Sequence, residues 1–347
     1  MPERATAAID ALKRLPRVAL ATLPTPLEDA PRLARELGVR KVLVKRDDLT
    51  GLGLGGNKVR KLEFLLGEAR ARGADTIITT AGIQSNFLRL TAAAVRRVGM
   101  KAILLVRGSP DEPLVGNLLL MRLFGADVRY MATEDPYAES TFALMREIED
   151  EVRQRGGHPY PIHLGTFSGG LSAVGYVHGA AELAAQLREA GEHADHVVLA
   201  VGSGGTYAGL LLGLRLAGMH CHVLGVSVNA PAEDHRRRIL GKMKTAAELL
   251  GSAVTVRDGD VDITDAHIGP GYGVPTAAGL EAIVQAACAE GLLFDPVYTG
   301  KAWAGLADTV RRGAIKPQDT VVFLHTGGAP NAFVHASAIA ERLSPST

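Results

Sequence analysis

Short apolar, β-branched runs alternate with longer amphipathic stretches along the sequence, and this alternation is the strongest constraint on the fold. The runs predict strands at residues 39–45, 75–80, 101–106, 196–201, 222–228 and 320–325. The stretches predict helices at residues 57–72, 86–98, 114–124, 136–153, 171–190, 205–217, 275–288 and 301–312. Strands that alternate with helices favour parallel sheets covered by helices on both faces. We therefore predict an α/β fold.

The length of the chain, 347 residues, favours two lobes around a shared cleft rather than one compact domain. We predict a small domain over residues 57–170 and a large domain made of residues 1–56 and 171–347. The Gly- and Asp-rich stretch 258–273 has weak periodicity. We expect an ordered loop at the cleft there, because compact domains rarely keep long structureless loops without a function.

Charge and cysteine content narrow the classes of function. Lys and Arg total 38 and Asp and Glu 37, so the net charge of +1 predicts no binding of nucleic acid or of an anionic membrane. The two cysteines, Cys221 and Cys288, form no CxxC, and no His/Cys cluster has metal-ligand spacing, so we expect no disulfides and no metal. The N-terminus lacks the apolar core of a secretory signal, and no apolar stretch reaches the roughly 18 residues of a membrane helix. A cytoplasmic location is expected.

The first segment with a chemical pattern is GLGLGGNKVRKLEF, residues 51–64. Its glycines bend the backbone tightly, after which Asn57 can cap a helix. Lys58 then lies in the first helical turn, close to Arg60 and Lys61. A helix N-terminus and neighbouring cations lower the pKa of a lysine, and a neutral amine can form a Schiff base.

Two common phosphate motifs do not fit this segment. A Walker A loop needs Lys directly after the second Gly and then Ser or Thr, whereas Asn57 precedes Lys58 here and Val59 follows it. A dinucleotide fingerprint needs an acidic residue at the end of the next strand, and none is found. Taken alone, a solvated helix lysine explains Lys58 at least as well as a Schiff base does. Arg60 and Lys61 could also neutralise acidic residues of the preceding turn, Asp47 or Asp48.

A polar triplet, Gln84, Ser85 and Asn86, follows the predicted strand 75–80 and precedes a helix. Proteins of the α/β class place ligand groups at such junctions. The free backbone N–H groups there bind anions such as a substrate carboxylate. Helix capping would explain one of these residues, but not three in a row.

A third segment, VGSGGTYAGL, joins the predicted strand 196–201 to the helix 205–217. Its small residues form a set of backbone N–H donors at a helix N-terminus, which is the physical requirement for binding phosphate. Tyr207 stands in place of the third glycine of G-x-G-x-x-G. The loop has no basic residue, so we expect it to bind phosphate through dipoles and hydrogen bonds only.

These segments together resemble the pyridoxal-phosphate (PLP) family that contains D-cysteine desulfhydrase, 1-aminocyclopropane-1-carboxylate (ACC) deaminase and cysteate sulfo-lyase. The similarity extends over nearly the whole chain, through the blocks LPTPLEDAPRLARELG, KRDDLTG, GGNKVRKLEFLL, GIQSN, VGSGGTYAGLLLGL, GPGYGVPT, GLLFDPVYTGKAWAGL and FLHTGGAP. The resemblance implies a tryptophan-synthase-β-like fold (fold type II) with two lobes, each a mostly parallel sheet covered by helices. It also implies PLP in the cleft, a large PLP-binding domain and a homodimer.

The resemblance assigns the cofactor to particular residues. Lys58 would hold PLP as a Schiff base and shuttle the α-proton. Asn86 would donate a hydrogen bond to the 3′ oxygen, and Thr299 would face the pyridine nitrogen. The phosphate would be bound by Gly202, Ser203, Gly204, Gly205 and Thr206.

A small amino-acid substrate is implied as well, and the resemblance places it among several of the same residues. Ser85, Tyr272 and Tyr298 would act beside Lys58 in catalysis, the tyrosines as acid or base groups. The substrate would contact Gln84, Ser85, Asn86, Phe87 and Phe167. Phe87 stands where desulfhydrases usually have histidine, and it cannot donate a hydrogen bond. Thr166 and Phe167 replace two usual glycines, so a more apolar or differently shaped amino acid is plausible.

Thr299 bears on the type of reaction. ACC deaminases have glutamate at the matching position, where it can keep the pyridine nitrogen protonated. A neutral hydroxyl still supports β-elimination, because the departing group takes the electrons, but it is a poorer partner for ring opening. We therefore expect a carbon–sulfur lyase or deaminase that resembles D-cysteine desulfhydrase and releases a 2-oxo acid and ammonia. A ring-opening deaminase, a cysteate sulfo-lyase-like enzyme, a racemase, a β-replacement enzyme and a non-catalytic binding protein remain alternatives.

Overall fold

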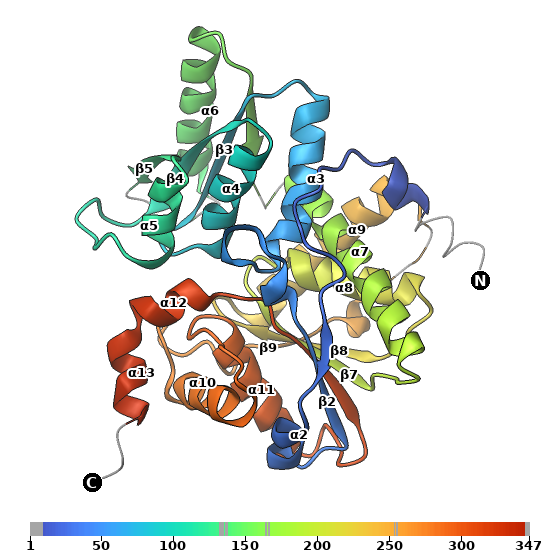
Figure 1. The fold of residues 1–347 in the computed structure, drawn as a ribbon. Coiled ribbons are helices and arrows are strands. Elements are labelled where there is room, and N and C mark those ends of the chain that lie inside the picture. The colour runs from blue at the N-terminus through green and yellow to red at the C-terminus, as the bar shows by residue number, and fades with distance from the viewer. Residues whose placement is uncertain are drawn as a thin grey trace.

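The computed structural model describes residues 10–131, 135, 138–163, 165, 167–252, 254 and 256–343. Within these ranges the chain forms two sheets that are covered by helices and lie in separate lobes (Figure 1). The larger sheet has the strand order β1-β2-β10-β7-β8-β9, and the smaller has β5-β4-β3-β6. In the described ranges, neighbouring strands run parallel except for β1 and β2. The predicted fold class is confirmed.

The small lobe is built from a continuous stretch of the chain. Its strands are β3 (Thr76–Gly82), β4 (Lys101–Arg107), β5 (Asp127–Met131) and β6 (Pro159–Ile162). Its helices are α3 (Lys58–Ala71), α4 (Asn86–Arg97), α5 (Gly116–Leu123) and α6 (Glu139–Gln154). Ile77, Ile78 and Leu104 on the central strands are fully buried, as expected for a parallel sheet with helices on both faces.

The large lobe combines the two ends of the chain. Its strands are β1 (Leu27–Asp29), β2 (Lys41–Lys45), β7 (His196–Val201), β8 (His222–Ser227), β9 (Asp262–Thr264) and β10 (Thr320–Leu324). Its helices are α2 (Pro31–Leu37), α7 (Phe167–Glu189), α8 (Gly205–Leu216), α9 (Ala232–Leu249), α10 (Ala277–Glu290), α11 (Thr299–Arg311), α12 (Ala329–Val334) and α13 (Ala336–Leu343). Three short 3₁₀ turns are η1 (Asp47–Leu49), η2 (Leu52–Leu54) and η3 (Asp258–Asp260).

Strands β2 and β10 bring the two ends of the chain together at the centre of the large lobe. They pair in parallel, with Lys41 opposite Thr320 and Lys45 opposite Leu324, and appear as a blue strand beside a red one in Figure 1. Because both strands end at the same edge of the sheet, the loops that follow them meet. The backbone N–H of Asn57 donates to the carbonyl of Thr326 at 3.0 Å.

All six predicted strands are present, but the sequence did not predict β1, β5, β6 or β9. These strands are short or lack an apolar run, and β6 reads PYPI, with two prolines that suit an edge strand. The helix predicted from residue 136 begins at Glu139, and Pro136 itself lies outside the described residues. The domain limits at residues 57 and 170 stay predictions.

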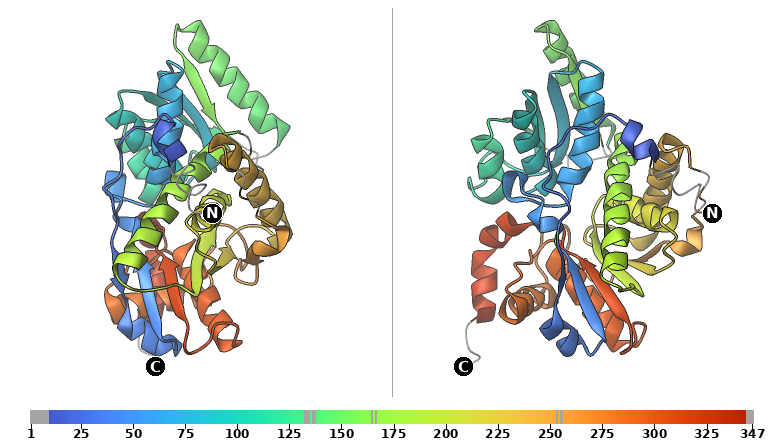
Figure 2. Two further views of the ribbon diagram at one scale, coloured as in Figure 1. Left: turned by 90° about the vertical axis from the view of Figure 1, so that its right-hand side faces the viewer. Right: turned by 45° about the vertical axis from the view of Figure 1, so that its right-hand side comes forward.

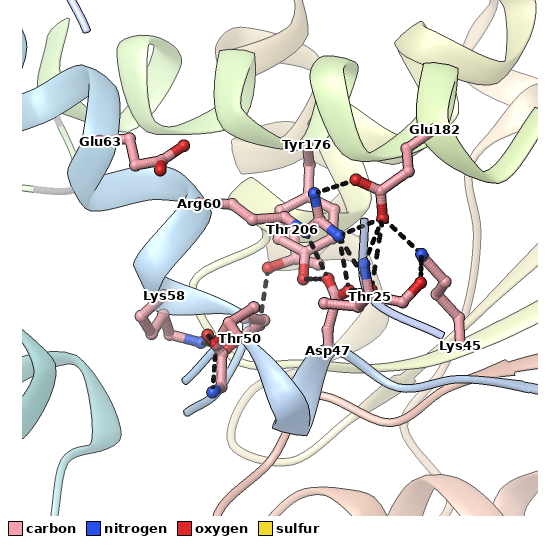
Figure 3. A network of polar contacts seen from close by, with 12 residues as sticks. Thr25, Lys45, Asp47, Thr50, Lys58, Arg60, Glu63, Tyr176, Glu182 and Thr206 are labelled. Atoms are coloured by element: carbon pink, nitrogen blue, oxygen red, sulfur yellow. Dashed lines mark hydrogen bonds and ion pairs between the residues drawn. The ribbon is translucent and has the colours of Figure 1, made fainter. Parts of the chain in front are cut away.

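A buried network of charged groups joins the two lobes behind the loop at residues 51–56 (Figure 3). Arg60 on α3 donates from Nε to Asp47 Oδ2 at 2.9 Å and from Nη2 to Glu182 Oε1 on α7 at 2.7 Å. Lys45 on β2 also pairs with Glu182, and the Tyr176 hydroxyl donates to Asp47. Burial alone would raise the pKa of Asp47, but Arg60 and Lys45 outweigh it, so that pKa lies below its usual value. Arg60 thus neutralises Asp47, as the sequence predicted.

Replacing Arg60 by Met should destabilise the protein by about 3–5 kcal/mol, because the substitution leaves the buried carboxylate of Asp47 without its cation. Chemical denaturation followed by circular dichroism measures this loss in the free energy of unfolding. The control is Arg146→Met, since the Arg146 pair with Glu139 is exposed and such pairs contribute little. Equal stabilities of the two variants would show that the network does not hold the lobes together.

Candidate active site

A pocket lies between the lobes at the carboxyl ends of β3, β7 and β10, where parallel sheets usually place ligands. Both lobes contribute to its lining. The lining residues are Asn57, Lys58, Lys61, Asn86, Ala200, Val201, Gly202, Ser203, Gly204, Thr206, Tyr207, Tyr298 and Thr326. The structure therefore brings together Lys58, Asn86, Tyr298 and most of the predicted phosphate loop.

Lys58 is presented by a sharply folded glycine loop. Gly55 has a φ of 64°, and a Cβ there would lie 1.8 Å from the carbonyl oxygen of Asp48, so only glycine fits. The Thr50 hydroxyl donates to the Gly56 carbonyl at 2.9 Å and accepts from the Gly56 N–H at 2.8 Å. The buried Arg89 donates to the carbonyls of Gly53 and Gly55. These bonds fix the backbone immediately before α3 begins at Lys58.

The ammonium group of Lys58 donates to Asn57 Oδ1 at 2.9 Å and lies 5.8 Å from the centre of the Tyr298 ring. Burial lowers the pKa of Lys58 to about 8; the charge of Asp295 opposes this change, and that of Arg89 adds to it. Asn57 does not cap α3 through its side chain, contrary to our prediction. Instead its amide donates to Thr206 Oγ1 at 3.0 Å. This bond connects the residue before Lys58 to the loop at residues 202–206.

Lys61 lies one helical turn beyond Lys58 and points at the start of α8. Its side chain is buried, and its Nζ would be 3.3 Å from a Cβ built on Gly205. Burial lowers the pKa of Lys61 well below its usual value, and the charges of Lys58 and Lys242 lower it further. The suggestion that Lys61 neutralises Asp47 or Asp48 is wrong, since Arg60 and Arg46 pair with them. The loop at residues 202–206 has no basic residue of its own, but α3 supplies one, Lys61.

The three residues of the polar triplet at the start of α4 make different contacts. Ser85 is the N-cap of α4 and accepts from the N–H of Phe87 at 3.1 Å, so capping accounts for this residue. Asn86 lines the pocket, and its Oδ1 accepts from Asn117 Nδ2 at 2.9 Å. Both ends of the Gln84 amide bond to the turn before α5, through Val115 and Asn117, and Gln84 does not line the pocket. The buried Asn117 was not predicted.

The two phenylalanines predicted at the substrate lie elsewhere. Phe87 is 3% exposed and packs in the apolar core around α4. Phe167 begins α7 and lines a separate surface hollow with Arg72 and Tyr160. Thr166 lies outside the described residues. Among the described residues, neither aromatic side chain lines the pocket that holds Lys58.

The two predicted tyrosines contact each other, and of the two Tyr298 lines the pocket. Their hydroxyl groups are 2.5 Å apart. A Cβ on Gly202 would lie 3.4 Å from the Tyr298 ring, and one on Gly82 would lie 3.3 Å from the Tyr272 ring, so the pair spans from the phosphate loop to the end of β3. Burial raises the pKa of Tyr298 well above its usual value, and Tyr272 raises it further.

The loop that carries Tyr272 is held by Lys301, a buried residue that was not predicted. Lys301 donates to the carbonyls of Ile268 and Gly271 at 2.7 and 3.2 Å. The expectation of an ordered loop holds for this part of the segment 258–273, while its first part forms η3 and β9. Tyr272 is therefore presented by a backbone fixed from α11.

Thr299 is fully buried against Asp295. Its hydroxyl donates to Asp295 Oδ1 at 2.8 Å and accepts from the Asp295 N–H at 2.6 Å, so its proton is already used. Thr299 does not line the pocket, whereas Thr326, after β10, does. The contact of Thr299 with a pyridine nitrogen stays a prediction, and Thr326 is a second hydroxyl that the sequence did not single out.

The residues of the pocket fit PLP. Gly204 has a left-handed backbone with φ of 81°, and helix α8 begins at the next residue, which leaves free N–H groups for a phosphate. A Cβ on Gly205 would fill the space between this loop, Ser172 and Lys61. Opposite the loop, Lys58 is an amine with a lowered pKa that can attack an aldehyde.

Fold and pocket together define a two-lobed α/β enzyme that holds an amine nucleophile beside an anion-binding loop. A family model described as pyridoxal-phosphate dependent enzyme matches residues 18–327. The chain is 40% identical over 330 residues to D-cysteine desulfhydrase of Salmonella choleraesuis, covering 93% of this chain and 97% of that protein. The chain belongs to the family of PLP-dependent enzymes, and the predicted family and cofactor are confirmed.

Solved structures support the same conclusion. A crystal structure of an ACC deaminase homologue superimposes with a TM-score of 0.87 at 36% identity, covering 96% of this chain and 98% of that one. Diaminopropionate ammonia lyase of Escherichia coli, at 17% identity and a TM-score of 0.70, shares the fold.

In the described ranges, no helix is long and apolar enough to cross a membrane.

Covalent attachment of PLP to the cofactor-free protein should become faster with rising pH, with a midpoint near 8. The reason is that only the neutral amine of Lys58 attacks an aldehyde, and its pKa is about 8. Borohydride quenching at timed intervals, followed by peptide mapping of pyridoxyl-Lys58, measures the rate. A rate that keeps rising to pH 10 without a midpoint near 8 would mean that Lys58 has an ordinary pKa.

Proposed function

We propose that this enzyme is a lyase that removes a β-substituent from a small amino acid and releases a 2-oxo acid and ammonia, as a D-cysteine desulfhydrase does. The observation that carries the proposal is the position of Lys58, a base of lowered pKa beside Tyr298, whose hydroxyl group is hydrogen-bonded to that of Tyr272. The relative named D-cysteine desulfhydrase, which covers nearly the whole chain, supports the same class of reaction.

Each residue of the pocket has a task in this proposal. PLP, when bound, withdraws electrons from the α-carbon of the substrate. Lys58 takes the α-proton, since its lowered pKa lets the amine be neutral near pH 8. The Tyr272–Tyr298 pair shares a hydrogen bond and is placed to move a proton at the leaving group. Asn86, held by Asn117, orients the cofactor ring through its amide.

Lys61 and the loop at residues 202–206 bind the phosphate in this proposal. The N-terminus of α8 supplies N–H donors and the positive end of the helix dipole. Lys61 adds a full charge at the same place. A buried lysine without a carboxylate partner is costly unless an anion joins it, which supports the assignment.

A ring-opening ACC deaminase is the second candidate, because the crystal structure with TM-score 0.87 is that of an ACC deaminase homologue. Against it stands the absence of a carboxylate at position 299. Asp295 accepts the hydroxyl proton of Thr299. The threonine hydroxyl therefore separates the carboxylate of Asp295 from any pyridine nitrogen beyond Thr299. The first candidate fits this arrangement better.

The function is tested by offering purified enzyme D-cysteine, L-cysteine, β-chloro-D-alanine and ACC, and measuring release of 2-oxo acid. We expect release from a β-substituted amino acid and little from ACC. Lys58→Ala should abolish turnover while circular dichroism stays unchanged, since the lysine side chain is half-buried and outside the apolar core. Faster turnover of ACC would favour the deaminase, and full activity of Lys58→Ala would refute the mechanism.

We also propose a homodimer in the cytoplasm. Exposed apolar side chains gather on α5 and α12, which pack together: Leu119 is 36%, Leu123 68% and Phe333 74% exposed. A second copy of the chain would bury them. Cys221 and Cys288 are both free, which fits a reducing compartment. Sedimentation equilibrium should give twice the chain mass of 36.5 kDa, and a single-chain mass would refute the dimer.

A further inference from the structure

Helix α9 lies against the back of the phosphate loop. It packs along α7 and α8, and Figure 2 shows it beside α7. A Cβ on Gly204 would lie 2.8 Å from Ile239 Cγ1, and a Cβ on Gly170 would lie 2.4 Å from Thr245 Cβ. Lys242 is three residues from each of these α9 residues and shares their face. It therefore faces the junction between the phosphate loop and the first turn of α7.

Lys242 is an unusual residue to find in this place. It is 7% exposed and has no hydrogen-bond or ion-pair partner among the described residues. The charges that shift the pKa values of both lysines are positive: Arg238 acts on Lys242, and Lys58 and Lys242 act on Lys61. Burial and, to a smaller extent, the charge of Arg238 lower the pKa of Lys242 to about 8. Buried cations are normally paired, so two of them without an ion-pair partner among the described residues indicate a site that favours an anion.

We infer that Lys242 is the second cation of the phosphate site, which binds the phosphate group of PLP from behind the loop while Lys61 binds it from the pocket side. The inference rests on the proposed phosphate site and extends it. Lys61 lines the pocket, whereas Lys242 does not, so Lys242 acts on the phosphate as a charge across the loop backbone. In a poorly solvated site such a charge attracts an anion strongly over several ångströms.

If Lys242 served only to stabilise the fold, replacing it by Met would destabilise the cofactor-free protein. The inferred role predicts no such loss. Met has a similar length and no charge, so it would remove an unpaired buried cation and leave the packing of α9 intact. Such replacements are often neutral or stabilising. The cofactor-free Lys242→Met protein should therefore fold at least as stably as the wild type. Any loss of phosphate affinity in this variant then reports on charge.

The experiment compares Lys242→Met with Lys244→Met, a control at an exposed position of the same helix. Dissociation constants of PLP and of pyridoxal, which has no phosphate, are measured with cofactor-free protein by absorbance titration. We expect Lys242→Met to weaken PLP binding about 10- to 100-fold, with pyridoxal binding unchanged. Inorganic phosphate should raise the melting temperature of cofactor-free wild-type protein more than that of the variant. Lys244→Met should match the wild type.

Two results would overturn the inference. One is unchanged PLP affinity in Lys242→Met, and the other is an equal loss for PLP and pyridoxal, which would indicate a packing defect. Both presuppose wild-type protein that binds PLP at Lys58. Wild-type protein that fails to bind PLP would instead refute the proposed function, so the two failures are distinguishable.

Discussion

The pairing of Arg60 with Asp47 is the interaction on which the site depends. Arg60 lies two residues after Lys58 on α3, and through Asp47 and Glu182 it fixes that helix to the end of β2 and to α7. Arg60 thereby holds the first turn of α3 in place. Lys58 and Lys61 belong to the same turn, so their positions are fixed as well. Burying these charged groups costs free energy, which their hydrogen bonds offset. The carboxylate of Asp47, for example, accepts hydrogen bonds from Arg60, Tyr176 and Thr25. Complete networks of this kind specify one arrangement, whereas incomplete ones would not.

The same helix keeps neutralised and unpaired cations apart. Arg60 faces the acidic network (Figure 3). Lys58 and Lys61 line the pocket, where the described residues offer them no ion pair. Burial and, to a smaller extent, the charges of Lys58 and Lys242 lower the pKa of Lys61, whereas burial and the charge of Arg89 lower that of Lys58 against the opposing charge of Asp295. One consequence is a lysine that is neutral near pH 8, and the other is a site that attracts an anion. The lowered pKa of Lys58 and the attraction of the site for an anion thus both follow from the burial of positive charge.

Much of this could be predicted from the sequence, because the pattern of strands and the glycine-rich turns are local signals. That reasoning predicted six of the strands and singled out Lys58, Asn86 and the loop at residues 202–206, and the fold class followed. Residues that act through tertiary contacts gave no such signal. Asn117 orients Asn86 from another helix, and Lys301 fixes the Tyr272 loop through backbone carbonyls. Asn57 illustrates the limit: its place before a helix suggested a cap, but a neighbour from the other lobe, Thr206, takes its amide.

Positions next to a motif are also poor guides to where a side chain points. Phe87 directly follows the pocket residue Asn86, yet successive residues of a helix are rotated by about 100°, so Phe87 enters the core. Gln84 precedes Ser85, but the turn at α5 uses both ends of its amide. The side chains that do reach the pocket include Asn86, Thr326 and Tyr298, and the hydroxyl group of Tyr298 is hydrogen-bonded to that of Tyr272. All of these are polar, whereas Phe87 packs in the core and Phe167 lines a separate surface hollow, so neither aromatic side chain lines the pocket.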